Sequence, residues 1–264
     1  MKKIGLNRIY GIILRHTFQS MHSITRMMDT IFWPVIDLLL WGLTSKYIES
    51  STVSIPNILL MVVSGIIFWM LVYRNQNMIT VSMLEDFWNR SFMHYFVAPV
   101  KFWEYILGTL LFALSKLGLT FVLSIFIAFI LYQTNLFVLG FSLIPFILNL
   151  LLTGWWVGFL VMGIILRYGS KVEILAWSFV AILSPFSAVY YPIEILPMWA
   201  QNIATLIPTS YIFEGMREVI NEGILDWNKI IISFMLNTGY LILTLIYLKY
   251  CYKKVLNKGL VKVF

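Results

Sequence analysis

The sequence has 264 residues, of which 60% are hydrophobic and only 12% are charged, against about 25% charged residues in ordinary soluble domains. A water-soluble domain of this length could not hide so much apolar surface, because much of its surface must face water. The composition therefore excludes a soluble globular protein and indicates one that lies in a lipid bilayer. The single cysteine, Cys251, excludes an internal disulfide and a cysteine-based metal cluster.

The first 28 residues are basic and amphipathic. At about 100° per residue, one side of a helix over residues 1–28 carries Arg8, Arg15 and Arg26, and the opposite side is apolar. Such a helix lies in the membrane interface, with its apolar face toward the acyl chains and its arginines at the lipid phosphates. It is either a simple anchor or a lever between the membrane and a cytoplasmic partner.

Six later stretches are apolar enough to form the helix of about 20 residues that crosses a bilayer. They are residues 30–45, 50–73, 105–132, 136–166, 174–193 and 230–248. Two of the stretches contain an ionisable residue, Asp37 in the first and Lys116 in the third. We therefore predict an all-α membrane protein whose residues 29–264 form one domain of six transmembrane helices.

Lysine and arginine concentrate on one side of these predicted spans. The side that holds the N-terminus receives 15 of them, and the other side receives 3, with Lys116 inside a span. Because short cytoplasmic loops carry an excess of Lys and Arg, we expect both termini in the cytoplasm and the protein in the inner or plasma membrane. The net charge of +7 is dispersed along one membrane face, which favours membrane lipids as partners and disfavours nucleic acid.

The cytoplasmic loop over residues 74–104 contains an acidic and aromatic segment, Glu85-Asp86-Phe87-Trp88-Asn89-Arg90. Two acidic residues suit the first turn of a helix, where the positive end of the dipole favours them. Pro99 would end that helix before the third span. We predict a short amphipathic helix at about residues 85–96, which either docks a cytoplasmic partner or packs on lipid.

The outer loop over residues 190–228 is rich in proline and has a strongly apolar middle. Pro197 is suited to open one short helix, and Thr209 or Ser210 to cap a second one. We predict a pair of re-entrant or interfacial helices at about residues 197–222 that closes the outer face, with protein covering their backbone. The residues of this predicted closure are Pro192, Pro197, Trp199 and Pro208.

The sequence contains no pattern typical of a reaction centre. His16, His22 and His94 lack the spacing of a helical zinc site, and no phosphate-binding run of the Walker type occurs. We therefore expect no catalytic residue, no metal and no cofactor in this chain, and no ATP hydrolysis by the chain alone. A path for a transported molecule would be lined by aromatic residues such as Trp33, Trp41, Trp69, Trp155 and Trp156.

Two motifs make the chain resemble the permease subunit of ABC type-2 exporters, over essentially its whole length. The first is Glu85-Asp86, Arg90, Val97-Ala98-Pro99-Val100, Glu104 and Leu107-Gly108, which is similar to the family's coupling helix and the start of the third span. The second and more specific is Ser184-Pro185-Phe186, Tyr191 to Trp199, Ile207 to Tyr211 and Arg217, which is similar to the signature after the fifth span.

The resemblance implies a half-transporter. A second permease copy would complete the pathway, in a homodimer or a heterodimer, and two copies of a separate ABC ATPase subunit would bind ATP and Mg²⁺ and drive export. The role of the coupling helix maps onto Glu85, Asp86, Phe87, Trp88 and Arg90, and the outer gate onto residues 197–222. The family often has Gly-Thr after the arginine of the coupling motif, whereas Ser91 and Phe92 follow Arg90 here, which puts the detailed contact with the ATPase in doubt.

Two rival functions stay open. A secondary transporter would use ionisable residues at the bilayer centre, and only Asp37 and Lys116 are available. These two residues either pair with each other, since both would lie about 12–18 Å into the bilayer from the cytoplasmic side, or face lipid headgroups or a water-filled cavity separately. A membrane-embedded enzyme would need a catalytic cluster. The substrate is not readable, and the resemblance implies a drug, lipid, glycan or ion.

Overall fold

The computed structural model describes residues 5–51, 57–89, 98 and 100–258, and within these ranges the chain is helical without any strand. The α-helices are α1 (Leu6–Met21), α2 (Ile24–Ser51), α3 (Ile58–Trp88), α5 (Phe102–Tyr132), α6 (Leu143–Tyr168), α7 (Leu175–Leu183), α8 (Met198–Ala204), α9 (Pro208–Glu222) and α10 (Trp227–Lys258). Short 3-10 helices connect some of them: η1 (Leu136–Ser142), η2 (Gly169–Val172), η3 (Ser184–Phe186) and η4 (Ile193–Ile195).

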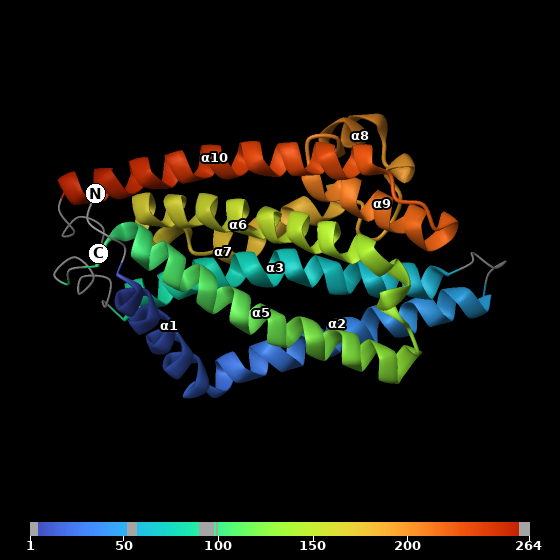
Figure 1. The fold of residues 1–264 in the computed structure, drawn as a ribbon, viewed down its shortest axis with the longest axis horizontal. Coiled ribbons are helices and arrows are strands. Elements are labelled where there is room, and N and C mark those ends of the chain that lie inside the picture. Colours follow the sequence, from blue (N-terminus) through green and yellow to red (C-terminus); the bar gives the residue numbers. More distant parts are fainter. Residues whose placement is uncertain (1–4, 52–56, 90–97, 99, 259–264) are drawn as a thin grey trace.

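The long helices α2, α3, α5, α6 and α10 extend along the long axis of the molecule and form its frame (Figure 1). Helix α3 is central, because it packs against α2, α5, α6 and α7 and is buried over most of its length. An apolar core surrounds it and includes the fully buried Phe68, Phe146 and Phe213. The start of α1 and the end of α10 lie at one end of this bundle, and α8 and α9 lie toward the other end (Figure 1).

The all-helical fold is confirmed, and five of the six predicted spans correspond to helices long and apolar enough to cross a membrane. These are Arg26–Ser50, Ile58–Trp88, Phe102–Tyr132, Leu136–Val172 and Trp227–Leu256. The predicted span at residues 174–193 is wrong as a continuous helix. Helix α7 has 9 residues, about 13 Å, against the about 30 Å of a hydrocarbon core.

Two residues explain why α7 is short. Pro185 lacks the N–H that would bond to the carbonyl four residues earlier, so the α-helix cannot continue through it, and the chain tightens into η3. Ala188 then takes a left-handed conformation with φ of 56°, which turns the backbone. The run is free of charged residues, but hydropathy alone does not reveal these two backbone features.

The predicted interface helix over residues 1–28 is broken into two. Helix α1 ends at Met21 and α2 begins at Ile24. The carbonyl of Ser23 accepts hydrogen bonds from the N–H groups of Arg26 and Met27, both at 3.1 Å, so it starts a new helix. Arg26 therefore belongs to the first long helix and not to the amphipathic one.

Candidate functional site

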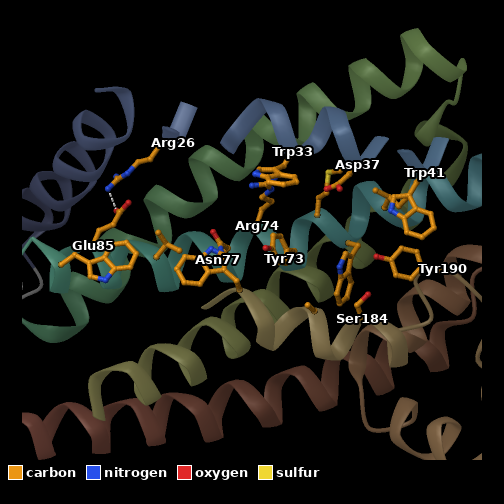
Figure 2. A pocket seen from close by; sticks show the side chains of 17 residues that line it. Arg26, Trp33, Asp37, Trp41, Tyr73, Arg74, Asn77, Glu85, Ser184 and Tyr190 are labelled. Carbon is orange, nitrogen blue, oxygen red and sulfur yellow. Dashed lines mark ion pairs between the residues drawn. The ribbon is translucent and has the colours of Figure 1, made fainter. Parts of the chain in front are cut away.

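The main candidate site is a cavity of about 600 Å³ on the side of the bundle where α2, α3 and α7 meet (Figure 2). Its lining is Arg26, Trp33, Asp37, Trp41, Ile66, Trp69, Met70, Tyr73, Arg74, Asn77, Val81, Glu85, Trp88, Trp177, Ala181, Ser184 and Tyr190. The residues contributed by α3 extend from Ile66 to Trp88, which is about 33 Å at 1.5 Å per residue. The cavity is thus about as long as a bilayer is thick, and Trp33 and Trp88 are half exposed at its rim.

Three of the five tryptophans predicted for a transport path line this cavity: Trp33, Trp41 and Trp69. Trp155 and Trp156 do not. The indole N–H of Trp156 donates to Asn237 Oδ1 at 3.1 Å, inside the contact between α6 and α10. The sequence could not separate the two groups, because a tryptophan in a packed helix contact and one on a cavity wall have the same local pattern.

Arg74 is the largest departure from the sequence prediction. The sequence predicts that Arg74 begins a cytoplasmic loop, but α3 continues for 14 more residues, and Arg74 lies buried within it and lines the cavity. The three residues that follow it, Asn75, Gln76 and Asn77, are also buried. These polar residues mark the end of the predicted second span, because that span was defined by apolar residues alone, but the helix does not end there.

This polar run fixes α7 against α3. The side-chain amides of Gln76 and Asn77 both donate to the carbonyl oxygen of Ala176, at 3.1 and 3.4 Å. The amide of Asn75 donates to the carbonyl oxygen of Leu151 on α6 at 3.2 Å. Hydrogen bonds of this kind offset the cost of burying polar groups, so the run holds α3 against α6 and against α7, of which α7 lines the cavity.

Three arginine–carboxylate pairs join the N-terminal segment to the ends of α3 and α5. Arg8 lies 3.4 Å from Glu104 and Arg15 lies 2.6 Å from Asp86, and Arg26 pairs with Glu85. We call these three pairs the ionic anchor. Each guanidinium thus has a carboxylate partner within the chain, which the prediction of contacts with lipid phosphates did not include. The charge pattern showed one basic helix and one acidic segment, but not that they meet.

The residues predicted to contact an ATPase divide into three groups. Glu85 to Trp88 form the last turn of α3 and do not begin a separate helix, and Asp86 and Phe87 are buried. Asp86 also accepts a hydrogen bond from the hydroxyl of Tyr105 at 2.9 Å. Trp88 is half exposed, and its indole N–H donates to Glu173 at 3.1 Å. Arg90 and the rest of the predicted helix to residue 96 lie outside the described residues.

Lys116, on α5, contacts α2 far from Asp37. The ammonium group of Lys116 lies 3.4 Å from the carbonyl oxygen of Arg26, which precedes Asp37 by 11 residues, or about 16 Å along α2. A pair between Asp37 and Lys116 within one chain is therefore wrong. The depth estimate failed because α1 packs along α5, so that α2 begins beside the middle of α5 (Figure 1).

His16 is fully buried between α1 and α5, where its ring stacks on Phe112 with 5.4 Å between centroids. Neither ring nitrogen has a hydrogen-bond partner among the described residues. Burial lowers the pKa of His16 to about 4; the positive charges of Arg15 and Arg26 act in the same direction and Asp86 opposes them. The imidazole is therefore neutral at pH 7.

The segment predicted to close the outer face contains two short helices, α8 and α9, within residues 197–222. Pro192 precedes η4 and Pro197 precedes α8, whereas Pro208 is the first residue of α9. Thr209 and Ser210 are therefore inside the first turn, and the predicted cap by either residue is wrong. Trp199 is exposed and packs edge-on against Phe186 with 6.1 Å between ring centroids.

Arg217 holds the turn that follows α7. Its guanidinium donates to the carbonyl oxygens of Ala188 and Tyr191 and to Glu214 Oε1, and Glu214 also accepts from the backbone N–H of Ile193. Burial lowers the pKa of Arg217, and the Glu214 carboxylate opposes this shift. The resemblance drew attention to Arg217, but its contacts follow only from the fold.

The described residues contain no group of three or more histidine, cysteine, aspartate or glutamate side chains that could hold a metal ion. The sequence profile of the family described as ABC-2 type transporter matches residues 11–221, which include α2 to α8, all but the last residue of α9, and every residue of the cavity. A search of curated proteins finds no significant match. Five long apolar helices and a match over most of its length show that the chain belongs to the ABC-2 type transporter family and is a transmembrane permease of that family.

Proposed function

We propose that this permease is half of an ATP-driven exporter: two copies form the pathway, and two separate ABC ATPase subunits bind ATP and Mg²⁺. Family membership supports the class of transporter. The observation that carries the proposal is the cavity, whose wall on α3 extends about 33 Å. Its half-exposed rim at Trp33 and Trp88 is a surface that a second copy would cover.

The proposed orientation places the ionic anchor and both termini at the cytoplasmic side. Moving Arg74 from a loop into a helix changes the count of Lys and Arg from 15 to 14 on that side against 3 on the other, so the bias still favours this orientation. In the proposed topology α7 and the turn after it make the sixth crossing. Helices α8 and α9 then close the outer face, with Arg217 as the residue that holds the turn to them.

Coupling to the ATPase is proposed to act through the ionic anchor. Helix α3 lines the cavity and also ends beside Arg15 and Arg26, so a displacement applied after Trp88 reaches both α1 and the inner end of the cavity. Packed helices transmit such a displacement as discrete shifts. The ATPases can bias the two states only by their different affinity for them.

The test is ATP hydrolysis and transport in proteoliposomes that contain the permease and its ATPase. Arg15→Glu and Asp86→Arg each break one pair of the anchor, and the double swap restores opposite charges. We expect each single variant to reduce permease-stimulated hydrolysis and transport together, and the double swap to recover part of both. Lys253→Glu, an exposed position on α10, is the matched control for charge reversal. Normal stimulation by the folded single variants, or a permease that never stimulates any ATPase, would contradict the proposal.

A further inference from the structure

The cavity contains two opposite charges near one level, on facing helices. The ion pair between Arg26 and Glu85 fixes a common level for α2 and α3, which are antiparallel (Figure 1). Asp37 follows Arg26 by 11 residues, and Arg74 precedes Glu85 by 11 residues. Each is therefore about 16 Å from the ion pair along its own helix. Figure 2 shows Asp37 and Arg74 on the cavity wall, between the ion pair and Trp41.

The wall around Asp37 is suited to a cation. Trp33, Asp37 and Trp41 follow one another at intervals of four residues, which places them on one face of α2, and all three line the cavity. The ring of Tyr190 stacks on Trp41 with 4.7 Å between centroids. Within the described part of the chain, the carboxylate of Asp37 makes no hydrogen bond or ion pair. Indole faces and a carboxylate together attract an organic ammonium group.

The wall around Arg74 is suited to an anion. A guanidinium presents five N–H donors in a planar fork that matches a phosphate or carboxylate group. Arg74 lines the cavity together with Asn77, one turn further along α3, and its guanidinium carbon lies 6.0 Å from the centre of the Tyr73 ring. Its positive charge acts on Asp37 through space, so both charges belong to one electrostatic site.

We propose that the substrate is a zwitterionic amphiphile, whose ammonium group binds at Trp33, Asp37 and Trp41 and whose anionic group binds at Arg74. This inference rests on the proposed function and names the substrate class of the same cavity. A cation bound at Asp37 lies close to the like charge of Arg74, and an anion bound at Arg74 lies close to the like charge of Asp37, which is costly where little water is present. A zwitterion places each of its charges beside the opposite charge of the protein, and its apolar body lies against the tryptophans of the cavity.

Three probes with one common acyl-chain length separate the alternatives: lysophosphatidylethanolamine as the zwitterion, lysophosphatidic acid as the anion and a primary alkylamine as the cation. Binding to the full-length permease in maltoside micelles is measured by quenching of tryptophan fluorescence. We expect the zwitterion to bind at least about tenfold more tightly than either other probe, as one additional charged hydrogen bond would give.

The variants assign each charge to its site. Asp37→Asn should remove the preference for the zwitterion over the anion, and Arg74→Gln the preference over the amine. Trp33→Leu should weaken the zwitterion and the amine but not the anion. Trp227→Leu, at the exposed start of α10 and outside the cavity, is the matched control for the loss of one tryptophan. If a single variant does not fold, the double variant Asp37→Arg with Arg74→Asp keeps both charges and should again prefer the zwitterion.

Equal binding of the zwitterion and of either single-charge probe by the unmodified permease would overturn the inference. So would an unchanged preference in folded Asp37→Asn and Arg74→Gln, or a folded double variant without the preference. This failure is distinguishable from failure of the proposed function, which is read from permease-stimulated ATP hydrolysis. Normal stimulation without zwitterion preference rejects the substrate class alone, and zwitterion binding without stimulation rejects the exporter.

Discussion

The contact between α1 and α5 depends on a glycine. A Cβ atom added at Gly108 would lie 2.8 Å from both Cβ and Cγ2 of Ile12, whereas carbon atoms pack at about 3.5–4.0 Å. Rotation of the Ile12 side chain cannot move its Cβ, so Gly108→Ala must push α1 away from α5 by about 1 Å. Gly118 lies on the same helix and has no atom within 4 Å of an added Cβ, so Gly118→Ala is the matched control.

The magnitude follows from two opposing effects. Replacing glycine by alanine inside a helix gains about 1 kcal/mol, and overpacking a close contact costs about 1–3 kcal/mol. Gly118→Ala should therefore be neutral or stabilising, and Gly108→Ala should lose up to about 2 kcal/mol of the free energy of unfolding. A shift of about 1 Å would also lengthen the 2.6 Å contact between Arg15 and Asp86 beyond the range of a charge-assisted hydrogen bond.

The assay is thermal unfolding of the purified permease, with protease cleavage within α1 as a measure of its docking. Gly108→Ala should lower the unfolding temperature and expose α1 to the protease, and it should reduce permease-stimulated ATP hydrolysis. Ile12→Ala removes Cγ2, one of the two close contacts, so the double variant should lose less than the sum of the single losses. If Gly108→Ala behaves as Gly118→Ala does and shows no coupling to Ile12, the reasoning about this contact is refuted.

Three further predictions concern other parts of the chain. His16, with a folded pKa of about 4 against about 6.5 when unfolded, resists protonation when folded. The contribution of neutral His16 to the free energy of unfolding should be fully present above pH 6.5 and should fall by on the order of 3 kcal/mol as the pH drops toward 4. If His16→Gln leaves the pH profile of unfolding unchanged, this reasoning is refuted. Arg217→Gln should cost about 1–3 kcal/mol, because it removes the donors to two carbonyl oxygens and the ion-pair partner of the partly buried Glu214 carboxylate. Arg217→Lys should not restore the loss, since one ammonium lacks the fork of donors; thermal unfolding is the measurement, and a fully stable lysine variant would contradict this. In intact cells, Asn221→Cys should react with an impermeant thiol reagent and Asn89→Cys should not, while the native Cys251 is buried; outside labelling at residue 89 would reverse the topology.

The sequence by itself determined the class of the molecule. Its apolar content and the length of its charge-free runs predicted five long helices that the structure has, because a helix that crosses a bilayer must be apolar over about 20 residues. Proline and a strongly apolar middle are local signals, and they predicted two short helices within residues 197–222, where α8 and α9 lie; Pro197, predicted to open a helix, precedes α8 instead. The motifs gave the family, which the profile match over residues 11–221 confirms.

Local signals failed where backbone geometry or a distant partner decides. The second span was predicted to end before Arg74 because that residue is charged. Helix α3 continues beyond it, since the side chains of Gln76 and Asn77 donate to a backbone carbonyl on α7, 100 and 99 residues away in the sequence. The fifth span was predicted to reach residue 193 because the run contains no charged residue. Helix α7 ends at Leu183, since Pro185 interrupts the helical hydrogen bonds. Hydropathy measures transfer to lipid, and it does not record whether a polar group has a partner inside the protein.

Only the tertiary structure brought the site together. The acidic end of α3 and the basic residues of α1 and α2 are 59 to 71 residues apart in sequence, as the pairs Arg26–Glu85 and Arg15–Asp86 show. Asp37 and Arg74 lie at similar positions along the bundle axis, because the ion pair between Arg26 and Glu85 fixes the antiparallel helices α2 and α3 relative to each other. Such a relation depends on the relative position of two helices along their axes, which is set by side-chain packing between them and is absent from the periodicity of either helix.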